Sequence, residues 1–298
     1  MKQFNAVCFG EVLWDLFPSG KKMGGAPLNV AFRLNQRGVS TTLISAIGED
    51  ALGNELQIAI EETGISAHLQ KNTTHSTGSV GVFLDEGGSA TYTIESPVAW
   101  DAIIYESAIE RYVEEADCLV FGSLVTRGAT SKNTLKKLLM KASYKVFDVN
   151  LRKPHYQHTD LLRWMNLADL IKCNEEELEE IVTYQGCTES DIEKQIVFLA
   201  QQTYTQQVCV TLGSKGAVWY EDSQFIYQSG FETKVADTVG AGDSFLGTLL
   251  AGLLSGQPRA DALEEACAMG ALVASRTGAN PIISQKELTE FLSKTKNT

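Results

Sequence analysis

Short apolar runs rich in β-branched residues recur along the chain and alternate with segments of helical length. They occupy residues 6–12, 41–48, 117–123, 144–150, 169–174 and 208–213. Their apolarity is continuous rather than alternating, which is typical of parallel strands buried on both faces of a sheet. The alternation of strands and helices predicts βαβ units, and therefore an α/β sandwich with a mostly parallel central sheet between two helical layers.

Residues 76–95 break this alternation. The stretch STGSVGVFLDEGGSATYTIE contains two runs of period-2 polarity around DEGG and no helical pattern, which predicts a β-hairpin. With part of residues 12–22 it would form a small projecting sheet, either a lid over a site or a decorative hairpin. No repeat or flexible linker marks a second domain. We expect one domain over residues 1–298, with a β lid formed by about 12–22 and 76–100.

Composition and charge exclude two classes of partner. Hydrophobic residues make up 44% of the chain and charged residues 21%, as in ordinary globular proteins. The formal net charge is −12, and no cluster of Lys and Arg offsets it locally, so no nucleic-acid partner is expected. The longest uncharged run, which begins at Ser244, is shorter than the roughly 20 apolar residues of a membrane span. No membrane partner is expected either.

The amino terminus and the cysteines predict a cytoplasmic protein. Glu11 and Asp15 fall inside what would be the apolar core of a signal peptide. The six cysteines show neither C-x-x-C nor Cys/His ligand spacing, and several lie in apolar runs. We therefore expect free thiols in a reducing compartment.

The segment ADTVGAGDSF, residues 236–245, places glycines and two aspartates directly before a helix. Apolar residues recur at helical spacing from Phe245 to Leu254, and Gly256 and Pro258 end the pattern. The first amides of a helix lack partners within it, and the helix dipole is positive at that end. The segment can therefore hold an anion without any lysine.

Asp243 would face the anion held by Gly240, Ala241 and Gly242. A carboxylate beside a phosphate is unfavourable unless it has a task, and accepting a proton from an attacking hydroxyl is such a task. Asp243 is therefore the candidate general base. The alternative is an ordinary first-turn acid that stabilises the helix dipole.

Three weaker elements accompany this one. Gly24 and Gly25 precede a helix that carries Asn29, which suits either a small polyol or a plain helix start. Asn174 and Glu177 lie on one face of a first helical turn, where they would position hydrated Mg²⁺ or only stabilise the dipole. The third element lies in VCVTLGSKGAVWY, which contains Thr211, Gly213 and Gly216 at a strand end and reads as a nucleotide site or a simple hairpin.

Neither a Walker A pattern nor a G-x-G-x-x-G after a strand occurs in the chain. The four elements, in this order and spacing, instead resemble the ribokinase-like carbohydrate kinases of the PfkB family. GGAPLN is similar to that family's first signature, and DTVGAGDSF matches its second without departure. The resemblance covers nearly the whole chain. It implies a ribokinase-like three-layer sandwich with a small β lid, and phosphoryl transfer from MgATP to a sugar hydroxyl.

The resemblance also implies a role for each candidate residue. The catalytic set is Asp243 as base, with Gly240, Ala241 and Gly242 as the anion hole. The sugar-binding set is Asp15, Gly24, Gly25, Asn29 and Arg152. The ATP-binding set is Asn174, Thr211, Gly213 and Gly216, and Glu177 joins Asn174 in holding Mg²⁺ through water.

Asp237 precedes the base by six residues and cannot share its phosphate. In many relatives the matching aspartate joins backbone carbonyls in a monovalent-cation site, whereas other relatives lack the cation. A K⁺ site of this kind would comprise Asp237 with the carbonyls of Val239, Val273, Arg276 and Gly278.

The acceptor sugar follows from finer resemblance. FGEVLWDLFP, SPVAWD and DVNLRKP are similar to the bacterial fructokinase branch, which implies fructose as substrate. Asp148, Asn150 and Arg152 form a D-x-N-x-R element that also occurs in 2-keto-3-deoxygluconate kinases, where an arginine would bind the carboxylate. Ribokinase and nucleoside kinase activities remain alternatives, as does a non-catalytic sugar sensor. An exposed lid edge would also allow a homodimer, as in many relatives.

Overall fold

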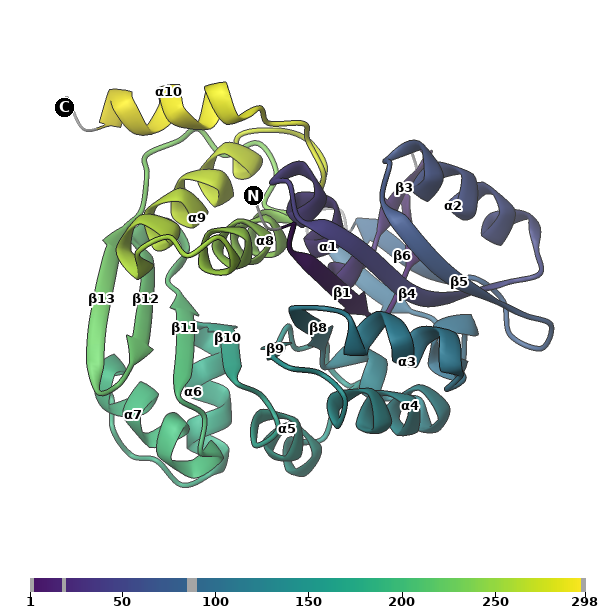
Figure 1. The fold of residues 1–298 in the computed structure, drawn as a ribbon, viewed down its shortest axis with the longest axis horizontal. Helices are drawn as coiled ribbons and strands as arrows, with labels where there is room; N and C mark the ends of the chain where they lie inside the picture. The colour runs from purple at the N-terminus through teal and green to yellow at the C-terminus, as the bar shows by residue number, and fades with distance from the viewer. Residues whose placement is uncertain (1–2, 18–19, 85–89, 296–298) are drawn as a thin grey trace.

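A computed structural model describes residues 3–17, 20–84 and 90–295 of the chain. The larger sheet comprises β1 (Asn5–Phe9), β4 (Ser40–Gly48), β5 (Ser66–Asn72), β8 (Cys118–Gly122), β9 (Lys145–Asp148), β10 (Leu170–Asn174), β11 (Gln207–Thr211), β12 (Gly216–Glu221) and β13 (Gln224–Ser229). Among the described residues it has nine strands in the order β13-β12-β11-β10-β9-β8-β1-β4-β5 (Figure 1). The β11–β12 and β12–β13 pairs are antiparallel, and every other neighbouring pair is parallel. The predicted α/β architecture is confirmed.

Helices cover both faces of this sheet (Figure 1). One face packs against α3 (Ser107–Glu114), α4 (Ala129–Leu139), α5 (His158–Met165), α6 (Glu175–Tyr184) and α7 (Ile192–Thr203). The other face packs against α1 (Ala26–Gln36), α2 (Ala51–Glu62), α8 (Ala241–Leu254) and α9 (Arg259–Ala274), and α10 (Gln285–Thr295) lies on α9. Successive strand side chains alternate between the two cores: Val7 and Phe9 enter the first, and Ala6 and Cys8 the second.

A second sheet has the order β3-β2-β6-β7. Its strands are β2 (Leu13–Phe17), β3 (Gly20–Gly24), β6 (Gly78–Leu84) and β7 (Ala90–Ile94). β6 and β7 pair antiparallel, as the hairpin pattern predicts, while the DEGG turn falls within residues 85–89, outside the described residues. Trp14 of β2 donates from Nε1 to the Leu52 carbonyl of α2 at 3.0 Å, which ties this sheet to the helical layer.

The strand order reverses beside β1. β1 lies between β4 and β8, so the chain passes to one side of β1 for β4 and β5 and later to the other side for β8. Ligands of open α/β sheets bind outside the carboxyl ends of the strands where the order reverses. Glu11 follows β1, Arg152 follows β9, and Asn174 and Thr211 end β10 and β11. These side chains therefore share one edge of the sheet.

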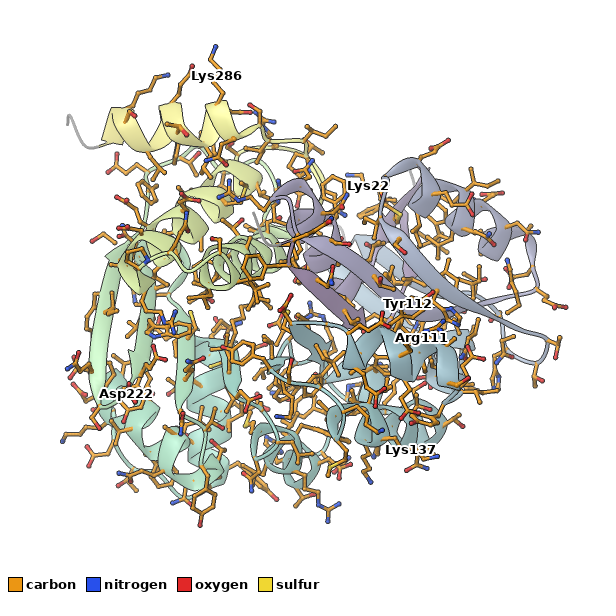
Figure 2. All side chains as sticks on the ribbon, in the orientation of Figure 1. Lys22, Arg111, Tyr112, Lys137, Asp222 and Lys286 are labelled. Atoms are coloured by element: carbon orange, nitrogen blue, oxygen red, sulfur yellow. The ribbon has the colours of Figure 1, made fainter. Side chains whose placement is uncertain are left out.

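Charged side chains lie on the surface, and the cysteines are unpaired. Lys286 of α10, Asp222 of the β12–β13 turn and Lys137 of α4 lie on the outside of the molecule (Figure 2). All six cysteines are free, and all except Cys187 are buried. Within the described ranges, no helix combines the length and apolarity needed to cross a bilayer.

Candidate active site

The helix start predicted from ADTVGAGDSF is present, and it places Asp243 in the first turn of α8. Gly240 caps the helix with φ 76°, and a side chain there would also overlap the Ala279 carbonyl, so the position requires glycine. Ser244 N makes the first helical bond, to Gly240 O at 2.8 Å. Ala241 N bonds back to Thr238 O at 3.2 Å. Of the predicted anion-hole residues, Ala241 is thus the one whose amide is already engaged.

The two glycine-containing motifs meet at the candidate base. Gly25 caps α1, and Asn29 lies one turn into that helix and is buried. Asn29 Nδ2 donates to Asp243 Oδ2 at 2.7 Å. Asn29 was predicted to contact the sugar, and the structure shows that its amide also contacts the carboxylate that would take the sugar's proton.

The surroundings of Asp243 raise its pKa to about 6. Burial is the main cause, because desolvation penalises the charged carboxylate, and the nearby carboxylate of Asp148 adds to it. Lys172, the hydrogen bond from Asn29 and the charge of Arg152 act in the opposite direction. A base whose pKa lies near neutrality is ionised at physiological pH and still accepts a proton readily.

Lys172 and Asp148 form a buried ion pair beneath the anion hole, which sequence reasoning missed. Lys172 Nζ lies 2.9 Å from Asp148 Oδ1, and both side chains are less than a tenth exposed. A Cβ on Gly242 would lie 3.3 Å from this ammonium, so Lys172 stands directly behind the Gly242 backbone. Burial works to lower the pKa of Lys172, but Asp148, Glu177 and Asp243 raise it overall. A lysine inside the apolar strand LIKCN was the signal available in the sequence.

Arg152 is exposed, and its charge acts on the carboxylates of the predicted sugar site. Burial raises the pKa of Glu11 to about 7 and that of Asp15 to about 6, and the charge of Arg152 opposes both shifts. Because Arg152 also acts on Asp243, one exposed guanidinium influences three carboxylates of the site. Gly24, at the end of β3, leaves the space that the Asp15 carboxylate occupies. The predicted sugar-binding residues are therefore brought together.

The predicted nucleotide residues line one cavity of about 950 Å³. Asn174, Thr211, Gly213 and Gly216 border it, together with Ala241 and Gly242 of the anion hole. The cavity has a further set of mainly apolar lining residues that sequence reasoning missed: Phe231, Val235, Phe245, Cys267, Ala271 and Ala274. A volume of this size and an apolar wall suit a ligand as large as a nucleotide.

Asn174 and Glu177 form a reciprocal capping box at the start of α6. Asn174 Oδ1 accepts from Glu177 N at 2.8 Å, and Glu177 Oε2 accepts from Asn174 N at 2.9 Å. Glu177 Oε1 accepts from Leu151 N at 2.8 Å. Both carboxylate oxygens are thus engaged by backbone amides, which supports the structural alternative for this pair. Its Mg²⁺ role remains a prediction, and no cluster of three acidic, His or Cys ligands occurs in the described part of the chain.

Asp237 joins the two segments that the resemblance places around a monovalent cation. Its Oδ1 accepts from Val239 N and its Oδ2 from Gly278 N, both at 3.0 Å. The Val273 carbonyl accepts from Arg276 N at 2.9 Å. These bonds hold the predicted ligands near one another, and the K⁺ site itself remains a prediction.

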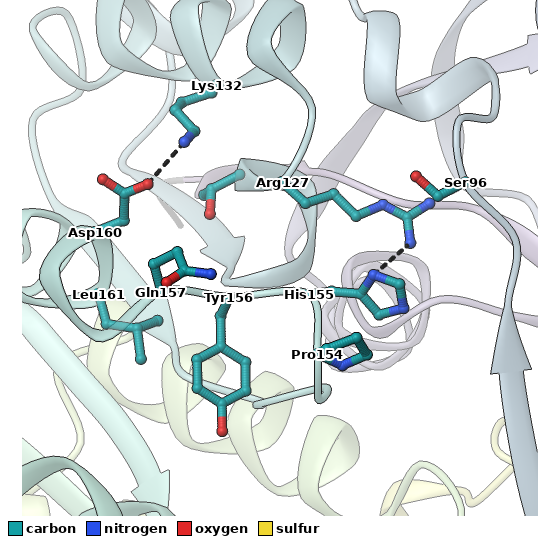
Figure 3. Close-up of a pocket in the computed structure, with 10 residues that line it drawn as sticks. Ser96, Arg127, Lys132, Pro154, His155, Tyr156, Gln157, Asp160 and Leu161 are labelled. Atoms are coloured by element: carbon teal, nitrogen blue, oxygen red, sulfur yellow. Dashed lines mark hydrogen bonds and ion pairs between the residues drawn. The ribbon is translucent and has the colours of Figure 1, made fainter. Parts of the chain in front are cut away.

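A smaller cavity of about 290 Å³ lies beside the loop from Pro154 to Gln157 (Figure 3). Its charged side chains are paired locally: Lys132 Nζ lies 2.7 Å from Asp160 Oδ2, and Arg127 Nε lies 2.8 Å from Asp101 Oδ1. Figure 3 also shows Arg127 directed toward His155. The cavity contains none of the predicted site residues.

Comparison with known proteins identifies the family of this chain. The family model described as pfkB family carbohydrate kinase matches residues 9–286. A sugar kinase of Pyrococcus horikoshii, itself uncharacterized, is 31% identical over 244 residues, which cover 78% of this chain and 74% of that protein. The fructokinase of Escherichia coli is 28% identical over 260 residues, or 83% of each chain.

Solved structures show the same fold. Xylella fastidiosa fructokinase with bound ATP has a TM-score of 0.87 at 23% identity, covering 98% of this chain and 99% of that one. Vibrio cholerae fructokinase, in a form with fructose, ADP and calcium ion bound, has a TM-score of 0.84 at 27% identity, covering 97% and 99%. The predicted family resemblance and ribokinase-like fold are confirmed.

Proposed function

This chain belongs to the pfkB family of carbohydrate kinases, and we propose that it transfers the γ-phosphoryl group of ATP to fructose, giving fructose 6-phosphate. Sugar kinase activity is the activity that defines this family. The choice of fructose is supported by relatives named as fructokinases at 26–28% identity and by the similarity to the fructose-bound Vibrio cholerae enzyme.

One observation carries the mechanism: the carboxylate of Asp243 is held by Asn29 at the start of α8, beside the cavity that Ala241 and Gly242 also line. The sugar hydroxyl attacks the γ-phosphorus in line as Asp243 takes its proton, and the bond to the β-phosphate oxygen breaks to release ADP. The amides of Gly240 and Gly242 and the ammonium of Lys172 stabilise the negative charge that the transferring group carries.

The sugar would lie between Asp243 and the second sheet. Asp15 of β2 and Arg152 after β9 are charged groups on that side, and they suit hydrogen bonds to sugar hydroxyls. The second sheet, to which Asp15 belongs, would act as the lid that excludes water from the phosphoryl group. Mg²⁺ enters with ATP and neutralises phosphate charge. The two carboxylate oxygens of Glu177 already accept hydrogen bonds from backbone amides, and the proposed mechanism does not require a direct bond between Glu177 and the metal.

A second acceptor is favoured by Arg152. Its guanidinium acts on Glu11, Asp15 and Asp243, so it faces the sugar side of the site. A guanidinium in this position would bind the carboxylate of an acid sugar with charge-assisted hydrogen bonds. 2-Keto-3-deoxygluconate is therefore the alternative substrate.

The test is ADP release from MgATP with fructose, 2-keto-3-deoxygluconate, ribose, glucose and adenosine. We expect the highest kcat/KM with fructose. Asp243→Asn serves as the inactive variant, and Asp222→Asn, at the exposed β12–β13 turn, is the matched control (Figure 2). A higher kcat/KM with the acid sugar would replace fructose by that substrate. Sugar binding without ADP release from any acceptor would instead support the sensor alternative.

A further inference from the structure

Asn280, which lies beyond both signature motifs, continues the hydrogen-bond chain that starts at Asp243. Asn280 Nδ2 donates to Asn29 Oδ1 at 2.7 Å, and Asn29 Nδ2 donates to Asp243 Oδ2 at 2.7 Å. Three segments far apart in the sequence, α1, α8 and the loop before α10, therefore meet through three consecutive side chains.

The carboxylate of Asp243 fixes which group donates and which accepts in each of these hydrogen bonds. An ionised Asp243 only accepts hydrogen bonds, so Asn29 must present its NH₂ group to it. Asn29 then presents its carbonyl oxygen to the opposite side, where only a donor can bond to it. Asn280 supplies that donor. Its own Oδ1 is buried and has no hydrogen-bond partner among the residues that the structure describes, and an unsatisfied acceptor destabilises a fold. Packing alone therefore does not explain an asparagine here.

The loop that carries Asn280 is held firmly against α8. Arg33, one turn after Asn29 on α1, is fully buried and donates to Ser244 Oγ at 3.2 Å and to the Pro281 carbonyl at 3.0 Å. Asn29 thus joins Asp243 to Asn280, and Arg33 joins the next residue of each segment. Gly278 N is bound by Asp237 in addition. The position of Asn280 is thereby fixed by its neighbours.

We propose that Asn280 is a positioning residue for Asp243: it holds the Asn29 amide in the one orientation that donates to the carboxylate. Without it, Asn29 rotates more freely and can turn its oxygen toward Asp243, which repels the ionised form. This inference rests on the proposed role of Asp243 as the base. Asn280 touches neither the sugar nor the nucleotide in this scheme and acts only through Asn29.

The other charged groups facing Asp243 come from different elements. They are Asp148 of β9, Lys172 of β10, Arg152 after β9, and Glu11 after β1. None of them is altered by substitution of Asn280. In Asn280→Ala, which adds no charge, a change in the titration of Asp243 would therefore report on the Asn29 hydrogen bond.

Asn280→Ala and Asn280→Asp are the informative variants, with Asn133→Ala on the exposed side of α4 as the matched control. Ala removes the donor, and we expect the acid limb of kcat/KM to move up by about half to one pH unit. Asp is nearly isosteric but accepts hydrogen bonds, so it favours the flipped Asn29 amide; the limb should move by about one to two units. Activity should largely recover at high pH, and the KM for ATP should not change.

Two further measurements separate this role from a structural one. Asn280→Ala in an Asn29→Ala background should leave the acid limb where Asn29→Ala alone puts it, because the effect passes through Asn29. Carbon-13 NMR titration of the Asp243 carboxyl, identified by its absence from Asp243→Asn, measures the same shift without turnover. An unchanged Asp243 titration in folded Asn280 variants would overturn the inference. If the Asn280 variants shift the Asp243 titration but the wild-type protein phosphorylates none of the acceptors, the proposed function is overturned and the positioning role stands.

Discussion

The base end and the nucleotide end of the site are built in opposite ways. At the base end, side chains from distant segments define the geometry: Asn29, Asp243, Lys172 and Asp148 are linked by hydrogen bonds or charge. At the nucleotide end, the cavity is bordered by glycines and other small residues. Its border includes Gly213, Gly216, Gly230 and Gly270.

This difference predicts two kinds of sensitivity. At the base end, a substitution that changes the type of one atom should reduce activity strongly, even if the side chain keeps its shape. At the nucleotide end, a substitution that changes the type of an atom should be tolerated, whereas one that adds an atom to a glycine should weaken ATP binding. Substitutions that are neutral in volume and substitutions that add a single methyl group therefore distinguish the two ends.

The largest effect is expected from Asp243→Asn, which changes chemistry without changing volume. Losing a general base costs about 10²-fold to 10⁴-fold in kcat. ATP affinity should change little, because the nucleotide cavity does not depend on this carboxylate. Measuring kcat by ADP release and the ATP dissociation constant by calorimetry checks both expectations. Wild-type turnover in a folded Asp243→Asn protein would remove Asp243 from the mechanism.

Gly216→Ala is the corresponding test of the nucleotide end. Its added Cβ would overlap the Gln228 carbonyl, and its φ of 111° is unfavourable for a residue with a side chain. We expect a loss of about 1–3 kcal/mol in the free energy of unfolding and roughly a tenfold rise in the KM for ATP, with the KM for sugar unchanged. Gly213→Ala is the matched variant, since it has positive φ but no atom within 4 Å of its Cβ. Equal effects of the two variants would show that backbone strain, rather than lost space, limits this end.

The sequence predicted the elements of both ends because their patterns are local. Continuous apolar runs predicted the parallel strands, period-2 polarity predicted the β6–β7 hairpin, and glycines before an apolar face predicted the start of α8. Parallel strands carry their carboxyl-end residues to one edge, so the placement of Asn174 and Thr211 followed from the order of elements.

Contacts between distant side chains were not predictable in this way. The Asn29–Asp243 hydrogen bond joins residues 214 positions apart, and it depends on how closely α1 packs on α8. Lys172 was read as part of a strand, and only the β9–β10 pairing, in which it lies opposite Asp148, reveals the ion pair. No local pattern marks Phe231 or Ala271 as cavity lining, because each becomes so through the fold around it.

Arg152 tests how strongly an exposed charge affects the pKa of Asp243 at the base end. Its charge lowers the pKa of Asp243, which nevertheless stands at about 6, so wild-type kcat/KM should fall as the pH drops through about 6. Arg152→Gln removes that charge and should move the acid limb upward by a few tenths of a unit, a small shift because solvent screens an exposed cation. With fructose, kcat/KM should fall by roughly 1.5- to 2-fold near pH 6 and less at pH 8.

The same variant distinguishes the two candidate acceptors. If an acid sugar is the substrate, Arg152→Gln should cost roughly tenfold or more in its kcat/KM at any pH, because charge-assisted hydrogen bonds are lost. Arg163→Gln, on the exposed side of α5, is the control. A pH-independent loss with fructose would show that Arg152 binds the sugar directly rather than through the field at Asp243.

The smallest effect concerns stability and shows what the base end costs the fold. The pKa of Asp243 is raised from 3.8 to about 6 by the fold, so the folded protein holds this proton more tightly than the unfolded chain does. The contribution of Asp243 to the free energy of unfolding therefore becomes less favourable to the folded state as the pH rises from about 4 through about 6. Asp243→Asn has no such proton to lose. At pH 8 it should be more stable than wild type by about 1–2 kcal/mol, a discounted figure because the charge of Asp243 is coupled to its neighbours. Urea unfolding at pH 4 and pH 8 measures the difference, which should nearly vanish at the lower pH. An equally large gain at both pH values would trace the effect to packing instead of charge, and the chemistry of the base end would then carry no cost in stability.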